Sequence, residues 1–447
     1  MKTARFMTAT GRTAVGLALA LGVSACGVFG GGDKKVTPTV GNRTAILSRI
    51  ETAKVDPALA GVAVVLPPAQ TNTEWTQAGG NAGKSYGHLA LADNLGQAWT
   101  ATVAGSSDRR RLAAAPVVGD GKLFVADSNG VVHAFDAQSG GKLWSRASEV
   151  GGDLRAANFG GGVSYDAGRV YATNGVGEVV ALDANTGAEV WKVKPAGPLR
   201  GAPTLAFGAV YVMTQDNQVI ALSAADGKLQ WNESGATAQT GLFGVASPAA
   251  GQGTVIAGFS SGELLAYRYE NGRTLWADAL ARTSISTEVG ALSDIDADPI
   301  IDSGRVYALG QGGRMAAYEL VTGQRIWELN LAGVSTPAVA GEWIFTLTDD
   351  ARLLAIARGN GRVRWITDLG RWRNAEKKKD PVFWTGPVLA GNQLWVANSE
   401  GQIYRVSVGE GSASLFQTLK SPIAQAPVVA NGTLYVLDEG GAIHAFR

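Results

Sequence analysis

The sequence has very few of the side chains that bind metals or form disulfides. Its 447 residues include one cysteine, Cys26, and three histidines. A single cysteine cannot form an internal disulfide, and no two histidines have the spacing of a zinc site. Charged residues make up only 17% of the chain and the formal net charge is +1, which is not the basic balance of a nucleic-acid-binding protein. We therefore expect no disulfide, no metal and no nucleic-acid partner.

The N-terminus is typical of an exported lipoprotein. Lys2, Arg5 and Arg12 precede an apolar stretch at residues 13–25. This stretch is too short for a membrane-spanning helix, which needs about 20 residues, and it matches the apolar part of a signal peptide. It ends in Val-Ser-Ala before Cys26 and resembles a bacterial lipobox, in which the cysteine carries the lipid. The alternative is an ordinary cleavage site with an incidental cysteine.

The chain is expected to divide into three parts. Residues 1–25 are predicted to be the signal peptide, residues 26–75 a lipid-anchored tether and packed segment, and residues 76–447 the folded domain. Gly27 follows the cysteine, where an aspartate would indicate inner-membrane retention in enteric bacteria. Its absence favours the periplasmic side of the outer membrane.

Glycine and tryptophan, in contrast, are abundant, with 60 and 12 residues, and they mark a repeat. One copy reads GRVYATNGVGEVVALDANTGAEVW and ends at Trp191. Related copies end at Trp144, Trp231, Trp276, Trp327 and Trp365, and a further copy ends at Phe416. A period of about 40 to 50 residues with four strand-like runs per copy predicts the blades of a β-propeller. We expect the repeated tryptophan to pack between neighbouring blades.

The two ends of the repeat region predict how the ring closes. Residues 425–447 contain only three strand-like runs, and residues 95–99 resemble a fourth strand without its first three. Joining them completes one blade. With seven complete copies, this gives an all-β, eight-bladed propeller with four antiparallel strands per blade, and closure leaves only short outer edges.

Two motifs of other protein classes do not fit this pattern. Gly258-Phe-Ser-Ser-Gly262 matches the nucleophile motif of hydrolases, but the repeat places it in a β-hairpin turn, whereas that motif needs a strand-to-helix turn. Asp294, Asp296 and Asp298 alternate as in a calcium loop. However, Pro299 and Arg305 occupy the positions that need glycine and a bidentate acid. We expect no calcium here.

The repeat resembles known families. The Ala-x-Asp-x-x-Thr-Gly-x-x-x-Trp pattern at residues 181–191 is similar to that of pyrroloquinoline-quinone (PQQ) dehydrogenases, but a second cysteine and an acid cluster for the quinone are missing. The whole chain more closely resembles the BamB family, lipoproteins of the outer-membrane β-barrel assembly machinery. That family combines a lipobox, a short tether and an eight-bladed propeller of this repeat.

Two loops carry the closer resemblance. Leu199-Arg200-Gly201 looks like the family's Leu-x-Leu-Arg-Gly loop, although its first leucine is Gly197 here. Residues 292–296, with Asp294 and Asp296, look like its Leu-Ser-Asp-Val-Asp loop. In the family both loops dock on the periplasmic POTRA domains of BamA, the barrel-forming subunit. The resemblance therefore implies partner-binding roles for Leu199, Arg200, Asp294 and Asp296.

The strand pattern separately places both stretches between a fourth strand and the next first strand. Such loops emerge on one face of a propeller, and residues 371–384 look like an insertion in a third loop of this class. We expect substitutions in these loops to spare the fold, because the loops would lie outside the blades.

We expect a non-enzymatic scaffold that binds BamA-like POTRA domains, needs no cofactor, and offers strand edges to unfolded outer-membrane proteins. The alternatives are a PQQ-dependent enzyme and a cell-envelope propeller that binds another ligand.

Overall fold

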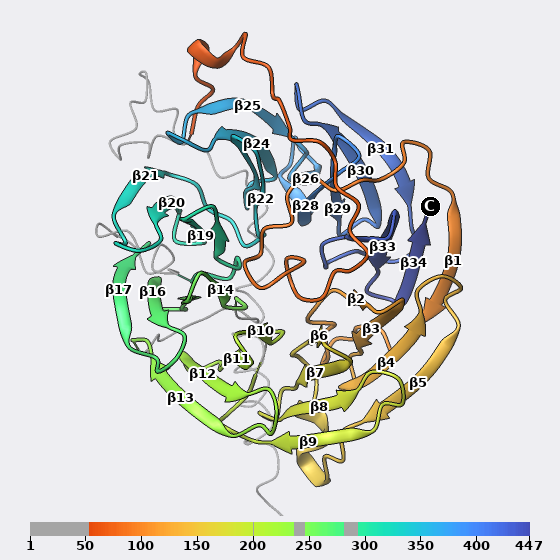
Figure 1. The fold of residues 1–447 in the computed structure, drawn as a ribbon. Coiled ribbons are helices and arrows are strands. Elements are labelled where there is room, and N and C mark those ends of the chain that lie inside the picture. The colour runs from red at the N-terminus through yellow and green to blue at the C-terminus, as the bar shows by residue number, and fades with distance from the viewer. Residues whose placement is uncertain (1–52, 200, 237–245, 281–293) are drawn as a thin grey trace, which may run out of the picture. The chain divides into compact units, whose positions relative to one another are not determined.

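Four-stranded antiparallel sheets repeat eight times around an axis in the computed structural model (Figure 1). The chain divides into two units, Met1–Arg49 and Ile50–Arg447. The structure describes residues 53–199, 201–236, 246–280 and 294–447, all in the second unit. The prediction of an all-β, eight-bladed propeller is confirmed.

Each blade begins with a short innermost strand and ends with an outer one. Blades 1 to 4 comprise β2 (Val117–Gly119), β3 (Lys122–Ala126), β4 (Val131–Asp136) and β5 (Lys142–Ala147); β6 (Val163–Asp166), β7 (Arg169–Thr173), β8 (Val179–Asp183) and β9 (Glu189–Val193); β10 (Thr204–Ala206), β11 (Ala209–Met213), β12 (Gln218–Ser223) and β13 (Leu229–Ser234); and β14 (Ala249–Gly251), β15 (Thr254–Gly258), β16 (Glu263–Arg268) and β17 (Thr274–Ala279).

Blades 5 to 7 follow in chain order. They comprise β18 (Ile300–Asp302), β19 (Arg305–Gly310), β20 (Arg314–Glu319) and β21 (Arg325–Leu329); β22 (Ala338–Ala340), β23 (Trp343–Leu347), β24 (Arg352–Ala357) and β25 (Val363–Asp368); and β28 (Trp384–Ala390), β29 (Gln393–Asn398), β30 (Gln402–Ser407) and β31 (Ala413–Thr418). A hairpin of β26 (Trp372–Asn374) and β27 (Lys379–Pro381) stands between blades 6 and 7, where the sequence indicated an insertion.

Blade 8 is built from both ends of the described chain, as predicted. It comprises β32 (Val428–Ala430), β33 (Thr433–Leu437), β34 (Ala442–Phe446) and β1 (Gln97–Thr102). The outer strand β1 pairs with β34, and Ala101 lies opposite Ile443. The only helices among the described residues are the short 3-10 turns η2 (Pro57–Leu59) and η3 (Gly152–Ala157), and none of them is long and apolar enough to cross a membrane.

The repeated tryptophan packs between blades, as the sequence predicted. The indole Nε1 of Trp144 donates to the backbone oxygen of Ala184 in blade 2 at 3.0 Å, and Trp276 donates in the same way to Leu320 in blade 5 at 2.8 Å. The turn glycine of the next blade lies against the ring: a Cβ on Gly187 would lie 2.7 Å from Trp144. The Thr-Gly-x-x-x-Trp spacing therefore encodes the contact between blades.

Residues 53–96 contain no blade strand and cross the ring from its rim to its centre. Figure 1 shows this orange trace passing from beside β25 through the middle of the ring to β1. Its central part, residues 67–91, is called the central segment below. Five innermost strands donate one middle backbone N–H each to this segment at 2.8 Å, from Val118, Tyr165, Leu205, Ala250 and Ile301. Without it, these N–H groups would be buried without partners.

Candidate functional site

The loops that join a fourth strand to the next first strand all emerge on one face, called the loop face below. This follows from four antiparallel strands per blade, because an even number of strands returns the chain to the face where the blade began. The two predicted docking loops are residues 194–203, between blades 2 and 3, and residues 280–299, between blades 4 and 5. The β26–β27 hairpin belongs to the same face.

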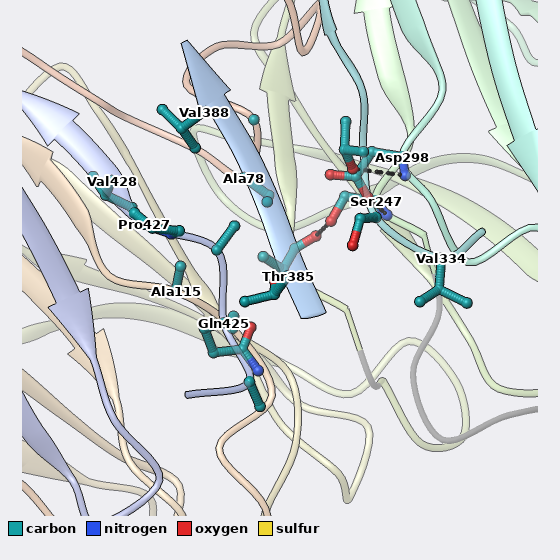
Figure 2. A pocket seen from close by; sticks show the side chains of 18 of the residues that line it. Ala78, Ala115, Ser247, Asp298, Val334, Thr385, Val388, Gln425, Pro427 and Val428 are labelled. Atoms are coloured by element: carbon teal, nitrogen blue, oxygen red, sulfur yellow. Dashed lines mark hydrogen bonds between the residues drawn. The ribbon is translucent and has the colours of Figure 1, made fainter. Parts of the chain in front are cut away.

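A cavity of about 390 Å³ lies on the axis, between the innermost strands and the central segment. Part of its wall is formed by the central segment. The rest is formed mainly by residues that precede or begin the innermost strands, so the cavity belongs to the loop face. Most of this wall is apolar or uncharged, and the acids on it are Asp296 and Asp298. Figure 2 shows Asp298 beside Ser247, with Pro427, Val428 and Gln425 on another part of the wall.

Leu199 lies in the core rather than on the surface. Its side chain is fully buried and packs with Leu205, Val210 and other residues of blades 2 and 3. Its backbone N–H donates to the oxygen of Asn174, and it bridges to Thr214. The expectation that the docking loops lie outside the blades is therefore wrong for Leu199, whose truncation should also destabilise the fold. Arg200 lies outside the described residues.

The second docking loop is fixed at its C-terminal end between blades 4 and 5. Ile295 is buried in the core cluster of these blades, and its backbone N–H donates to the oxygen of Phe259. Asp294 is also buried, with 2% of its surface exposed, and its backbone oxygen accepts from Gln311. Consequently Asp296 is held at the cavity wall by ordered neighbours. Because Asp294 is buried, the expectation that substitutions in these loops spare the fold is wrong for Asp294 as well.

Asp296 is the most unusual group on the loop face. Neither carboxylate oxygen has a hydrogen-bond partner among the described residues, although both oxygens are buried. Burial, followed by the nearby charges of Asp294 and Asp349, raises its pKa from 3.8 to about 7. A carboxylate in this situation is stabilised by any basic group that enters the cavity. Partner contact by Leu199, Arg200, Asp294 and Asp296 stays a prediction.

Sequence reasoning missed Lys84 in the central segment. Its side chain is buried, with 1% exposed, and its Nζ donates to Thr204 Oγ1 at 3.1 Å. Burial lowers its pKa to about 8, and the charge of Asp298 opposes this shift. Asp298 in turn accepts from the backbone N–H of Ser247 at 2.7 Å, and burial raises the pKa of its carboxyl. The only sequence signal was a lysine within a glycine-rich stretch.

The histidines and the hydrolase-like motif have structural roles. His133 Nε2 lies 2.9 Å from Asp127 Oδ2, and His444 Nε2 lies 3.0 Å from Asp438 Oδ2. Both pairs link a third strand to the preceding turn in their own blades, so the repeat accounts for them. Gly258-Phe-Ser-Ser-Gly262 occupies the turn between β15 and β16, as expected. Among the described residues, no three His, Cys, Asp or Glu side chains are grouped to hold a metal.

The fold and the loop face define the class: an eight-bladed β-propeller with an acid-bearing axial cavity at the centre of its longest loops. The model of the family described as outer membrane protein assembly factor BamB matches residues 87–157 and 128–367. A protein of this name from Salmonella typhimurium (strain LT2) is 30% identical over 334 residues, covering 74% of this chain and 83% of that protein. The chain belongs to the BamB family.

A further relative agrees with this assignment, and solved structures share the fold. The assembly factor BamB of Escherichia coli K12 is 28% identical over 352 residues, covering 78% of this chain and 88% of that protein. The crystal structure of BamB from Moraxella catarrhalis superposes with a TM-score of 0.65 at 19% identity, over 79% of this chain and all of that one. A quinohemoprotein alcohol dehydrogenase from Comamonas testosteroni has a TM-score of 0.64 at 16% identity, covering 85% of this chain and 81% of that one, and shares the fold.

Proposed function

We propose that this protein is a non-enzymatic scaffold of the machinery that assembles outer-membrane proteins, and that its loop face binds the periplasmic POTRA domains of BamA. Family membership supports the assembly role. The observation that carries the docking proposal is the buried carboxylate of Asp296 at the cavity wall, which has no hydrogen-bond partner among the described residues. A basic side chain of the partner would satisfy it, and Arg200 on the other docking loop would supply the opposite charge.

We further propose that Cys26 anchors the chain by lipid to the periplasmic side of the outer membrane, after removal of residues 1–25. Cys26 and the signal peptide lie outside the described residues. The described chain begins at the rim of blade 6, so residues 26–52 are available as a tether. Several acyl chains on one cysteine would hold a protein at a membrane far better than a single chain.

The outer strand edges provide a second surface for the same role. Fourth strands form the outer edges of the sheets and expose apolar side chains, namely Leu143, Val190, Leu229, Leu275, Ile326 and Leu415. The edge of β25 already carries an extended segment, because Val55 forms a parallel bridge to Val363 and the N–H of Asp56 donates to its oxygen at 2.8 Å. We propose that the remaining edges accept extended strands of unfolded outer-membrane proteins.

Co-purification from detergent-solubilised outer membranes tests the scaffold proposal directly. The wild-type chain should co-purify with BamA. A Cys26→Ser chain should fail to be processed as a lipoprotein and should be missing from the outer membrane after a high-salt wash. A wild-type chain that leaves BamA in the unbound fraction would refute the docking proposal. Quinone-dependent dye reduction by the purified chain would instead support the enzyme alternative.

A further inference from the structure

Lys84 is a buried cation at the point where the two docking loops approach each other. Burying an ammonium group is costly unless it is paired, and an apolar side chain of similar volume would often be more stabilising. Lys84 donates a hydrogen bond to the hydroxyl of Thr204, and the charge of Asp298 acts on its ammonium group electrostatically. The positions of Thr204 and Asp298 in the fold indicate the role of the Lys84 ammonium group.

The two partners of Lys84 belong to the C-terminal ends of the two docking loops. Thr204 is the first residue of β10, directly after residues 194–203. Asp298 lies within residues 280–299, two positions beyond Asp296 and just before β18. One ammonium group therefore interacts with the end of each loop.

The hydrogen bonds around Lys84 extend this link between the loops. The Thr204 hydroxyl donates to the oxygen of Pro248 at 2.6 Å, and the Ser247 hydroxyl donates to the oxygen of Ala202 at 3.0 Å. The Ser247 backbone N–H donates to Asp298 at 2.7 Å. Residues 202, 204, 247, 248 and 298 thus form one buried network in which Lys84 supplies the positive charge.

The backbone around Lys84 is shaped to place it there. Gly79 has φ +68°, and a Cβ on it would lie 3.0 Å from the Lys84 side chain. The oxygen of Gly83 accepts from Ile301 of β18 at 2.8 Å, and the Ser85 hydroxyl donates to Asp302 at 3.0 Å. The residues on both sides of Lys84 are therefore fixed to the strand that follows the second docking loop.

We propose that Lys84 is a positioning residue of the docking face, which holds the ends of the two docking loops at the separation that the partner requires. This inference rests on the proposed docking function. Lys84 itself is buried and does not touch the partner.

Three variants of the mature chain in detergent test this inference. Lys84→Met removes the charge at similar volume, and Lys84→Met with Asp298→Asn also removes the carboxylate that would be left unpaired. Asn72→Ala is the matched control, because it deletes the hydrogen bonds that this side chain donates to the backbone oxygens of Glu74 and Val429, away from the docking loops and the cavity wall. The readouts are the melting temperature, amide hydrogen exchange, and calorimetric affinity for purified POTRA domains of the cognate BamA.

We expect Lys84→Met to speed amide exchange at residues 201–206 and 294–302, and to weaken POTRA binding about tenfold or more, as for loss of a hydrogen bond to a charged group. The double variant should recover the melting temperature while binding stays weak. Asn72→Ala should leave affinity unchanged even if it lowers the melting temperature.

The opposite results would overturn the inference. If affinity recovers together with melting temperature in the double variant, Lys84 has only a general structural role. Unchanged exchange in both loop ends of Lys84→Met would exclude the positioning role even if binding changes. If the wild-type chain does not bind POTRA domains, the proposed function fails, while the exchange data still decide whether Lys84 fixes the loops.

Discussion

At the scale of residues, the repeat depends on turn glycines that pack on tryptophans of the neighbouring blade. Gly187 has φ +69° and lies against the Trp144 ring. Its position therefore requires both a positive φ and the absence of a Cβ. Gly168 has a similar φ of +81°, but no atom lies within 4 Å of the place that a Cβ on it would occupy. Alanine substitutions at Gly168 and Gly187 therefore distinguish the cost of backbone strain alone from the added cost of a steric clash between blades.

Gly187→Ala should destabilise the protein more than Gly168→Ala. Both variants lose roughly 1 kcal/mol because an alanine is held at positive φ, and only Gly187→Ala adds a clash with a tryptophan, about 1–3 kcal/mol. Denaturant unfolding of both variants measures the difference. Equal denaturation midpoints for the two variants would show that the contact with Trp144 does not require glycine at position 187.

Asp296 should make stability and binding respond to pH in opposite directions. Its folded pKa of about 7 exceeds the usual 3.8, so the folded state binds the proton more tightly than the unfolded chain. Stability from this group is complete below about pH 4 and is lost as pH rises through 7. Asp296→Asn should therefore melt at a higher temperature than wild type at pH 8, and this gain should shrink toward pH 5. At pH 8 the variant should bind POTRA domains more weakly than wild type does. A gain that does not depend on pH would contradict the raised pKa.

At the scale of elements, the repeat predicted the strands, but the sequence did not reveal what lies on the axis. Because strand-like runs, turn glycines and tryptophans recur in each copy, the strand positions inferred for one copy predict those of the others. The central segment occurs once, and its bonds join Trp75 to Val118 and Gly83 to Ile301 across long stretches of sequence. The burial of Leu199 and the role of Lys84 depend on such long-range contacts, which no local pattern encodes.

The β26–β27 hairpin should be dispensable for folding. Residues 373–381 are all exposed, and the ion pair of Arg373 with Glu400 is at the surface, where such pairs contribute little. Replacing residues 373–380 by a short Gly-Ser turn should leave the melting temperature within about 2 °C of wild type, since exposed substitutions have small effects. A large fall would show that the hairpin stabilises blades 6 and 7.

At the scale of the whole molecule, the ring depends on pairing between sequence-distant strands. Deleting residues 425–447 removes β32, β33 and β34, which leaves β1 without its partner and exposes the apolar faces of blades 7 and 1 that pack on blade 8. We expect aggregation or a large drop in melting temperature, because the apolar burial of a whole blade is lost. The hairpin replacement serves as the control for shortening the chain. Cooperative unfolding near the wild-type midpoint would contradict closure through blade 8.

The central claim is that the loop face binds the POTRA domains of BamA. Calorimetric titration of the mature chain with these domains tests it, with Arg200→Ala, Asp294→Ala and Asp296→Asn as variants and Lys228→Ala, on the opposite face, as control. We predict that wild type and Lys228→Ala bind equally. Arg200→Ala should lose about 2 kcal/mol and each acid variant about 1 kcal/mol. Unchanged affinity in all three loop variants, or no binding by wild type, would contradict the account.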